Sequence, residues 1–570
     1  MKKSRSRPVP TVPHRGRLLG TVALALAAVT AFASTTVAQA ARMASKPTKA
    51  CTAGQARNSS GKCVKRTVPT KAAATTAAPA STAAPASTGA PAAAGSGVQR
   101  DKVTIAFPVE PDQLDDYTGE HRFEGTQMNE TLEVQDQKTG AILPWLLSEK
   151  PKNTDPFALE WELKLRTDVT FHDGSPFNAQ SVIDQITYAR TVKGITELGG
   201  ATNMALLSSF TGSGNTVKLT YSTPQPLLPK QLTYFKVQKI VNGKPSAIGT
   251  GPFKLQEWAR GSRLVMTAYD KYWGPKPNVK TIEMKYIPDP AARLAALLAG
   301  EVDLVTNMSV EDASRAPQLI ASDGSLLMYR IQLNNRDGVT QDVRVRQALN
   351  YAIDKDGMNK AFFNGQAAID NCQSLSPGMT GFNASLKPYP YDPAKAKALI
   401  KEAGAEGMKM DLYQAADRWT KGLEIVQAVA QMWTAAGIQT TVKNVPFSQW
   451  LEVAQKQPGP RPDSFFVGAG LRLQDGSDLR GYLLSTPAVG TISSVSDPQI
   501  DKMMIDASAV ADEAQRDKAF QTLSAKICRD ATFAYLFSPK ILTGVAKGVS
   551  FTPDIRDARW FKVSGFTFSK

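Results

Sequence analysis

Residues 163–182, with the sequence LKLRTDVTFHDGSPFNAQSV, constrain the fold of this chain more than any other segment. The opening LKLR alternates apolar and polar side chains, as a half-buried strand does. VTF is a second short β-prone run, and the Asp-Gly and Pro that follow favour a tight turn. Asn178 is a typical N-cap for a helix over residues 179–190. The segment therefore predicts two strands, a turn and a capped helix, with His172 beside Asp173 in the turn.

The adjacent His172 and Asp173 raise the question of catalysis. The other histidines are His14 and His121, and the sequence contains no HExxH, paired CxxC or G-x-S-x-G motif. We expect a histidine inside such a tight turn to be structural. A secreted hydrolase that uses His172 and Asp173 is kept as an alternative.

Two other segments resemble catalytic or cofactor motifs without meeting their requirements. Gly249–Gly251 has the glycines of a phosphate-binding turn, but Pro252 removes an amide donor and no helix follows. Asp115 and Asp116 could act as an acid and a base, yet adjacent side chains diverge and acidic residues are common in exposed loops. We therefore expect a chain without a catalytic site, a cofactor or a directly coordinated metal ion.

The net charge of +16 is confined to the front of the chain. The first 100 residues contain fifteen Lys and Arg and no Asp or Glu, which leaves 52 basic and 51 acidic residues in the remainder. A nucleic-acid-binding protein usually carries its positive charge on the folded surface or on an adjoining arm. Protein targeting explains the basic front better, so we expect no nucleic-acid partner.

The front of the chain has the three parts of a secretory signal peptide, over residues 1–40. A basic stretch precedes an apolar, Ala-rich run, and the triplet Ala-Gln-Ala fits a cleavage site that would cut after Ala40. Residues 41–100 form a tail rich in Ala, Thr, Pro and Ser, and such a composition buries too little apolar surface to fold. We expect an exported protein that is periplasmic, attached to the cell surface or secreted.

Four cysteines in an exported protein favour disulfide bonds. Cys51 and Cys63 flank a short polar loop that one bond could close, and Cys372 and Cys528 remain for a second bond. Four cysteines allow three pairings, and the sequence does not choose among them. Two buried free thiols in the body are the alternative.

The body from residue 101 onward mixes helix and strand patterns without a strict repeat, which favours α/β lobes rather than one barrel. The clearest helix patterns cover residues 290–298, 343–363, 392–404, 421–436 and 511–528, and two of them, 290–298 and 392–404, have Asp-Pro at the start and Gly at or just after the end. The clearest strand patterns cover residues 103–107, 216–221, 263–269, 281–287 and 437–442.

Five motifs occur in one order along the body. They are the 163–182 segment, GTGPF with the later YDKYWGPKP, PDPAARLAALLAGEVDLV, VRVRQALNYAIDKDGM and YPYDPAKAKALIKEAG. Together they resemble the extracytoplasmic solute-binding proteins of the peptide/nickel ABC-importer family, family 5, over about residues 101–570. The resemblance implies an α/β, bilobed fold of the periplasmic-binding-protein type, of the large class with an extra subdomain. The ligand would be enclosed in a cleft between the lobes.

The resemblance also implies how the chain divides. Residues 101–328 together with 535–570 would form lobe I, and residues 329–534 would form lobe II. The predicted hinges are Met328-Tyr329 and Ala534-Tyr535. Cys372 and Cys528 then fall in the same lobe, which allows them to pair.

The function implied by the resemblance is binding rather than reaction. Such a protein captures a small organic solute, peptide-like or carboxylate-bearing, as the lobes close. It delivers the solute, as a monomer, to the transmembrane subunits of an ABC permease. A ligand-sensing receptor with the same fold is the alternative.

Ligand contacts are implied for three segments. The first loop over the cleft carries Tyr117, which could stack or hydrogen-bond, and Arg122, which could pair with an anionic group. Trp419 begins a helix of lobe II near the site, where core packing is its alternative role. The candidates that line the cleft from lobe I are Tyr234, Phe235 and Gln238.

The segment 466–484, FVGAGLRLQDGSDLRGYLL, departs from the family pattern. Peptide-binding members usually carry Trp-Gly there, followed by an Asp that pairs with the α-amine of the peptide. Alignment places Ala-Gly at the Trp-Gly and Arg472 near the Asp, and a cation there would repel an ammonium by about 1 kcal/mol or more. Asp475 could substitute if the loop shifts by three residues. We therefore expect a carboxylate-bearing ligand clamped by Arg472 and Arg122, and nickel only as a chelate.

Overall fold

The computed structural model describes residues 55–57, 63–65, 100–111, 113–116, 123–137, 139–191, 206–321, 327–416, 418–455, 461–471, 473–485, 492–553 and 561–569. The chain divides into two compact units, Met1–Gly89 and Ala90–Lys570. In the first unit, β1 (Gln55–Arg57) and β2 (Cys63–Lys65) pair antiparallel. Cys51, the predicted signal peptide and most of the predicted tail over residues 41–100 lie outside the described residues, so a Cys51–Cys63 bond stays a prediction.

A seven-stranded sheet in the second unit is built around β3 (Arg100–Phe107), which is buried over most of its second half, as a central strand is. β15 (Val279–Tyr286) and β16 (Leu304–Val305) pair with it on either side, both parallel. α6 (Pro290–Leu298) joins these two strands and begins at the predicted N-cap, Asp289. The outer strands are β14 (Arg263–Ala268) and β13 (Phe253–Ala259) beyond β15, and β24 (Leu542–Val545) and β17 (Gln318–Ala321) beyond β16.

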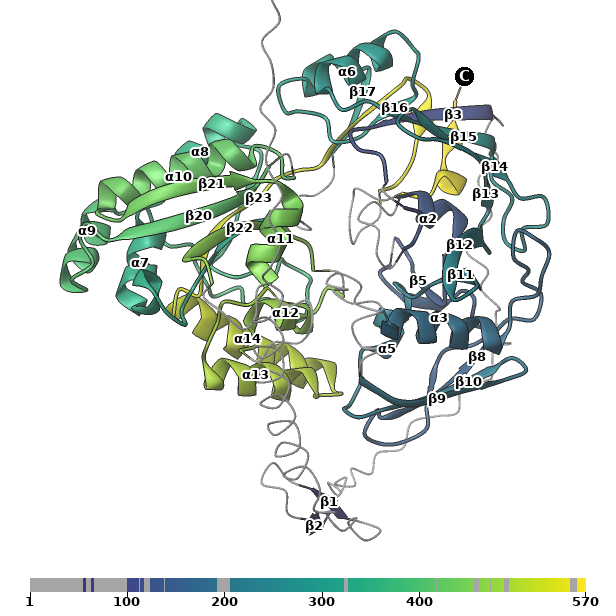
Figure 1. Ribbon diagram of the computed structural model, residues 1–570, viewed down its shortest axis with the longest axis horizontal. Coiled ribbons are helices and arrows are strands. Elements are labelled where there is room, and N and C mark those ends of the chain that lie inside the picture. The colour runs from purple at the N-terminus through teal and green to yellow at the C-terminus, as the bar shows by residue number, and fades with distance from the viewer. Residues whose placement is uncertain are drawn as a thin grey trace, which may run out of the picture. The chain divides into compact units, whose positions relative to one another are not determined.

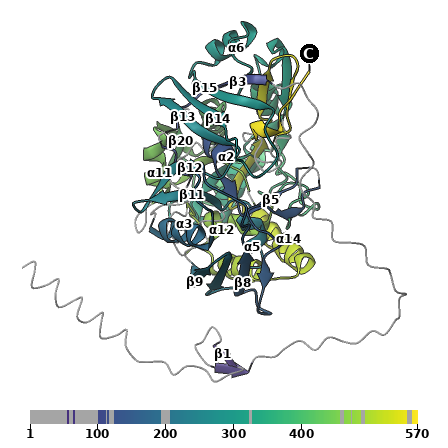
Figure 2. The ribbon, with the colours of Figure 1, turned by 90° about the vertical axis from the view of Figure 1, so that its right-hand side faces the viewer.

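α3 (Ala179–Thr191) is the predicted capped helix of the 163–182 segment, and it packs between two smaller sheets (Figures 1 and 2). The VTF run before it is not a strand. It forms one isolated bridge, between Thr170 and Pro176, because the amide of Phe171 bonds to Ser175 within the turn. The two sheets are β7 (Lys152–Asn153), β8 (Glu160–Lys164), β10 (Thr216–Tyr221) and β9 (Leu207–Ser213), and β12 (Lys244–Gly249), β11 (Lys236–Val241) and β4 (Glu130–Thr131).

His172 explains why the HDG turn and the GTG segment occur together. Its Nδ1 accepts from the Gly249 amide at 3.2 Å, and its Nε2 lies 3.0 Å from the Gly251 carbonyl. Burial lowers the pKa of His172 to about 4, so the ring is neutral and Nε2 carries the proton. The Asp173 carboxylate pairs with Lys239 instead of the imidazole. Both side chains therefore stabilise the turn, which contradicts the hydrolase alternative.

A six-stranded sheet has β18 (Met328–Leu333) near its middle, antiparallel to β22 (Ser464–Ala469) and β23 (Phe533–Ser538). Alternate residues of β18 enter different hydrophobic cores, with Tyr329 and Ile331 on one face and Met328 on the other. The remaining strands are β19 (Ala368–Ile369) beside β23, and β20 (Lys409–Ala415) and β21 (Gln439–Val445) beyond β22.

Helices fill the core on each face of this sheet (Figure 1). The core around Tyr329 takes residues from α7 (Val343–Tyr351), α8 (Lys355–Phe363), α9 (Pro393–Glu402) and α10 (Gly422–Ala436). The core around Met328 takes residues from α12 (Arg480–Leu483), α13 (Pro498–Ser508) and α14 (Glu513–Arg529). The single helix predicted over 343–363 is two helices, because Asp354 caps the second by accepting from the Gly357 amide. None of the described helices is long and apolar enough to span a membrane.

The chain passes between the two large sheets twice. It enters the six-stranded sheet at Met328 and leaves it after Ser538, since all of β23 pairs in that sheet. β24 then returns to the seven-stranded sheet at Leu542. The second crossing thus lies at residues 539–541, a few residues beyond the expected hinge at Ala534-Tyr535. The division into two lobes that move about these crossings stays a prediction.

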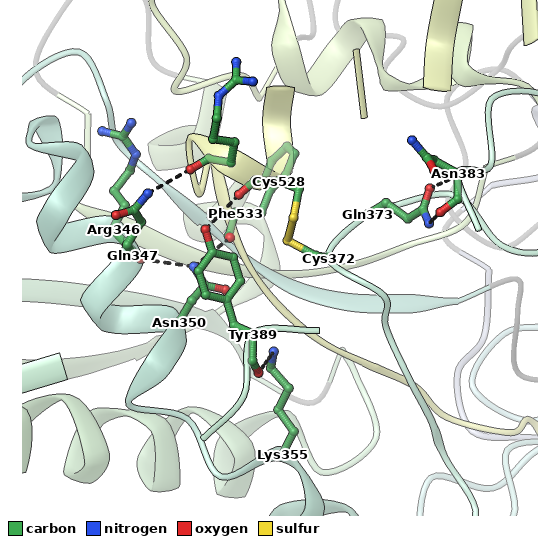
Figure 3. The surroundings of a disulfide bond; sticks show 11 residues. Arg346, Gln347, Asn350, Lys355, Cys372, Gln373, Asn383, Tyr389, Cys528 and Phe533 are labelled. Atoms are coloured by element: carbon green, nitrogen blue, oxygen red, sulfur yellow. Dashed lines mark hydrogen bonds between the residues drawn. A yellow bond between two sulfur atoms is a disulfide. The ribbon is translucent and has the colours of Figure 1, made fainter. Parts of the chain in front are cut away.

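A disulfide bond joins Cys372 to Cys528, 156 residues further along the chain (Figure 3). Cys372 follows β19, and Cys528 lies in the last turn of α14. The bond therefore ties the segment after β19 to the helix that covers the Met328 face. The Tyr389 hydroxyl donates to the Cys528 carbonyl at 2.9 Å beside the bond.

Candidate functional site

The loop predicted to carry Tyr117 and Arg122 is fixed at both ends. Asp116, directly before it, is 3% exposed and pairs with Lys236 Nζ at 3.0 Å. α2 (Phe123–Met128), directly after it, is also largely buried. Tyr117 and Arg122 lie outside the described residues, so their ligand contacts stay predictions.

Gly125 and Gln238 hold the Asp116 end of this loop. A Cβ atom on Gly125 would lie 2.0 Å from Asp116 Oδ1, so only glycine lets the carboxylate rest against α2. Gln238 Oε1 accepts from the Asp116 amide at 3.1 Å, and its Nε2 donates to the Leu114 carbonyl at 2.7 Å. Gln238 was expected in the ligand site, and its contacts are those of a residue that positions the loop.

Tyr234 and Phe235 lie in different surroundings. Phe235 is 1% exposed and belongs to the core around α3 and its sheets. Tyr234 is 5% exposed and forms a small apolar cluster with Leu227 and Leu473. Leu473 belongs to the loop after β22. Tyr234 therefore brings the first half of the body against the loop that carries Arg472.

The loop after β22 makes a second contact with the first half of the body. Gln135, the last residue of β5 (Glu133–Gln135), donates from Nε2 to Gln474 Oε1 at 3.2 Å. Arg472 itself lies outside the described residues, but Leu471 and Leu473 on either side of it are buried. The backbone on both sides of this arginine is thus anchored where the two halves meet.

Asp475 is buried in an ion pair. Its Oδ2 accepts from Arg516 Nε at 3.0 Å, and the two side chains are 0% and 4% exposed. Its Oδ1 accepts from the Ser477 amide at 2.9 Å and caps a short 3-10 helix, Gly476–Leu479. The carboxylate that was expected to substitute for the family's ammonium-binding Asp therefore already has a cation. Sequence reasoning missed Arg516, because no local pattern links residues 41 positions apart.

Trp419 packs before α10 and is half-buried. Its Nε1 donates to the Gly468 carbonyl at 3.0 Å, and its ring lies edge-on to Trp450 and Phe466, with centroids 5.3 Å away in each case. A Cβ atom on Gly468 would lie 2.6 Å from the Trp419 ring, so β22 needs glycine here. The core packing weighed for Trp419 is thus observed, and a ligand contact stays a prediction.

Three buried carboxylates follow the Tyr117–Arg122 loop, and sequence reasoning missed all of them. Burial raises the pKa of Glu124 to about 7 and of Glu133 to about 8, and it raises the pKa of Glu130 as well. Glu124 accepts from the Tyr286 hydroxyl at 3.2 Å, and Glu130 accepts from the Tyr272 hydroxyl at 2.7 Å. Acidic residues in a short helix-to-strand segment usually indicate an exposed face, which explains the omission.

The expected site residues are only partly brought together. Tyr234 contacts the residue next to Arg472, and Gln238 holds the loop that leads to Tyr117. Trp419 bonds to Gly468 in β22, and Asp475, in the loop after β22, pairs with Arg516. No group of three His, Cys, Asp or Glu that could hold a metal ion occurs within the described ranges.

Comparisons with curated proteins give two informative relatives. The chain is 31% identical over 325 residues to the nickel-binding periplasmic protein of Escherichia coli (strain K12), a match that covers 53% of this chain and 61% of the relative. It is 34% identical over 220 residues to the dipeptide-binding protein of the same organism, covering 36% of this chain and 40% of the relative. The chain thus spans less than two thirds of the length of either relative.

The fold and the family are established by two further comparisons. The ABC transporter-associated periplasmic binding protein DppA from Helicobacter pylori, solved with the peptide STSA, superposes with a TM-score of 0.71 at 20% identity. That match covers 83% of this chain and 99% of the other and confirms the expected α/β fold of periplasmic binding proteins. The family model described as bacterial extracellular solute-binding proteins, family 5 Middle, matches residues 141–488, more than half of the chain. This protein therefore belongs to family 5 of the bacterial extracellular solute-binding proteins.

Proposed function

We propose that this protein is exported, captures a small carboxylate-bearing solute, and delivers it to the transmembrane subunits of an ABC permease. Family membership makes it a binding protein of the extracytoplasmic space rather than an enzyme. The basic, apolar and small-residue segments ending at Ala40 supply the export signal. The low-complexity tail over residues 41–100 would then separate the folded body from the new N-terminus. The body would act as a monomer.

The ion pair between Asp475 and Arg516 is the observation that favours a ligand carboxylate over a ligand ammonium group at this loop. Breaking a buried pair by taking away one partner costs about 3–5 kcal/mol, so a ligand's ammonium group gains little from this carboxylate. Arg472, three residues earlier, lies in the same anchored loop and is the residue that would meet a ligand group there. A ligand carboxylate, paired with Arg472 and with Arg122 across the site, satisfies both cations.

The named relatives fit this ligand class in two ways. One is a nickel-binding protein, and a nickel ion held in an organic chelator would present carboxylates to the two arginines. The other is a dipeptide-binding protein, and a peptide would present its terminal carboxylate. We place Tyr117, Tyr234 and Trp419 in the walls of the site. The residues that support the site from behind, without touching the ligand, are Phe235, Gln238 and Asp475.

Native mass spectrometry of freshly purified protein tests the proposal, because proteins that enclose a ligand often retain it. We expect a bound carboxylate-bearing compound that is lost from Arg472→Ala and retained by Arg529→Ala, whose side chain is 69% exposed. An unchanged ligand load in Arg472→Ala would remove the clamp role.

Transport is tested by comparing uptake of the identified compound in cells with and without the gene. Uptake should fall when the gene is deleted and recover with the wild-type copy. Unchanged uptake together with an altered cellular response to the compound would indicate a sensing receptor instead.

A further inference from the structure

Arg330 is a fully buried cation in the middle of the six-stranded sheet. It is the third residue of β18, between Val467 of β22 and Tyr535 of β23. Side chains alternate along a strand, so Arg330 shares the face of Met328, which α12, α13 and α14 cover. Its exposed fraction is 0%.

The guanidinium of Arg330 makes no hydrogen bond to any residue that the structure describes. Nε and both terminal nitrogens are buried without a partner among the residues that the structure describes. Its neighbours are aromatic rings, Tyr482 with its centroid 4.3 Å away and Phe533 at 5.0 Å. Cation–π contacts offset part of the desolvation, but they leave five N–H donors unused. Arg346, also buried, donates instead to the carbonyls of Asp530, Thr340 and Gln341.

Asp370 is a buried carboxylate whose charge acts on Arg330. Asp370 lies beside β23. Its amide donates to the Leu536 carbonyl, and its Oδ1 accepts from the Ser538 hydroxyl at 2.9 Å. It attracts Arg330 electrostatically, but its Oδ2 has no hydrogen-bond partner in the described part of the chain. Lys355 is 4% exposed, and the charges of both Asp370 and Asp356 act on its ammonium group.

Protonation of Asp370 weakens it further as a counter-charge for Arg330. Burial raises the pKa of Asp370 to about 7, and it lowers the pKa of Lys355 to about 8. Near neutral pH the acid is therefore partly protonated, while a guanidinium keeps its charge. No carboxylate of the described residues bonds to the Arg330 guanidinium, and a buried positive charge is strongly unfavourable unless an anion accompanies it.

We propose that Arg330 is a binding site for one carboxylate group, held between the Tyr482 ring and the segment that begins at Asp370. The guanidinium fork matches a planar carboxylate with two parallel hydrogen bonds, and flanking aromatic faces favour a flat group. Gln332, two residues along β18, donates to the Tyr482 carbonyl at 3.0 Å and fixes that side of the site. The carboxylate belongs either to the captured solute or to a free small acid.

The site lies close to the loop described above. Met328 pairs with Ala469 at the end of β22, and Arg472 follows three residues later. Two residues of extended strand, about 7 Å, therefore separate Arg330 from the end of the sheet at which that loop begins. If the carboxylate belongs to the captured solute, the inference rests on the proposed function. If it belongs to a free small acid, the inference does not depend on that function.

Thermal unfolding in sodium acetate, compared with sodium chloride at equal pH and ionic strength, tests the site. We expect acetate to raise the unfolding midpoint of the wild type and to have no such effect on Arg330→Met. In chloride, Arg330→Met should unfold at or above the wild-type temperature, because it removes an unpaired buried charge. Arg529→Met, which removes an exposed cation, should respond to acetate as the wild type does.

Arg330→Lys keeps the charge and loses the fork, so acetate should bind it at least tenfold more weakly. Arg330→Lys can also replace Arg330→Met in the acetate test if Arg330→Met does not fold. If acetate has no effect, but native mass spectrometry finds an acid that Arg330→Met and Arg330→Lys both lose, the carboxylate is the solute's. Equal acetate responses in all variants, or no acetate response and no bound acid, would overturn the proposal. A retained acetate response without any solute uptake would remove the proposed function alone.

Discussion

Arg516 Nε lies 3.0 Å from Asp475 Oδ2, and this ion pair is almost completely shielded from water. It links α14 to the loop after β22, at the position where the family resemblance suggested a ligand contact. The structure gives this carboxylate a role in holding the loop.

Asp475→Asn should therefore lower stability far more than ligand affinity. The substitution leaves Arg516 buried without its counter-charge, which costs about 3–5 kcal/mol of unfolding free energy. Urea denaturation would measure this loss. The double variant Asp475→Asn/Arg516→Met should recover part of it, since no isolated charge remains. A folded Asp475→Asn protein that has lost its ligand would instead show a direct contact.

Gly125→Ala should disturb the Tyr117–Arg122 loop from behind. The new methyl group would lie 2.0 Å from Asp116 Oδ1 and must push that carboxylate away from Lys236. We expect a loss of about 1–3 kcal/mol in stability, together with weaker ligand binding. Gly565→Ala is the matched control, because nothing lies within 4 Å of its Cβ position. Equal stability and binding in the two variants would show that Asp116 does not constrain the loop.

The buried carboxylates make stability depend on pH in a defined direction. The pKa of Glu133 is about 8 in the folded protein, against about 4.3 for an unfolded glutamate. Between these values the folded state holds a proton that the unfolded state releases. The free energy of unfolding therefore falls as pH rises through this window, by at most about 1.4 kcal/mol per pH unit from this group.

Glu133→Gln should remove that dependence. The variant should match the wild type near pH 4 and exceed it in stability near pH 9, which denaturant titrations at both pH values would show. His172, whose folded pKa is about 4, acts in the opposite direction below pH 6.5. It is present in both proteins, so their difference isolates Glu133. A constant difference across the pH range would contradict the raised pKa.

Local signals in the sequence predicted the helices well but gave no sign of the side-chain pairings around the expected site residues, for one physical reason. Asp289 and Asp392 accept from backbone amides three residues on, so a few adjacent letters contain the whole cap. The His172 turn was also recognised, although its partner segment at Gly249–Gly251 was interpreted separately. Site residues depend on pairings made only after folding, such as Asp475 with Arg516.

Buried charge was the hardest feature to predict. Arg330 alternates with the apolar Tyr329 and Ile331 along a strand. This pattern predicts that Arg330 lies on a solvent-exposed face of the sheet, whereas helices cover both faces. Glu124, Glu130 and Glu133 were missed for the same reason. Their environments come from distant segments, among them Tyr286 and Tyr272.

The Cys372–Cys528 bond should stabilise the six-stranded half of the body strongly. In the chain-entropy account, a crosslink across 156 residues restricts the unfolded chain by about 5 kcal/mol. The segment after β19 also relies on it, since Cys372 and Gln373 connect this segment to α14 and to Asn383. Cys372→Ser/Cys528→Ser should therefore lose several kcal/mol in urea denaturation under oxidising conditions. The wild type measured with reductant should approach the double variant, whereas the double variant should not respond to reductant. If reductant lowered the stability of the double variant equally, the stabilisation would belong to the cysteines in the tail instead.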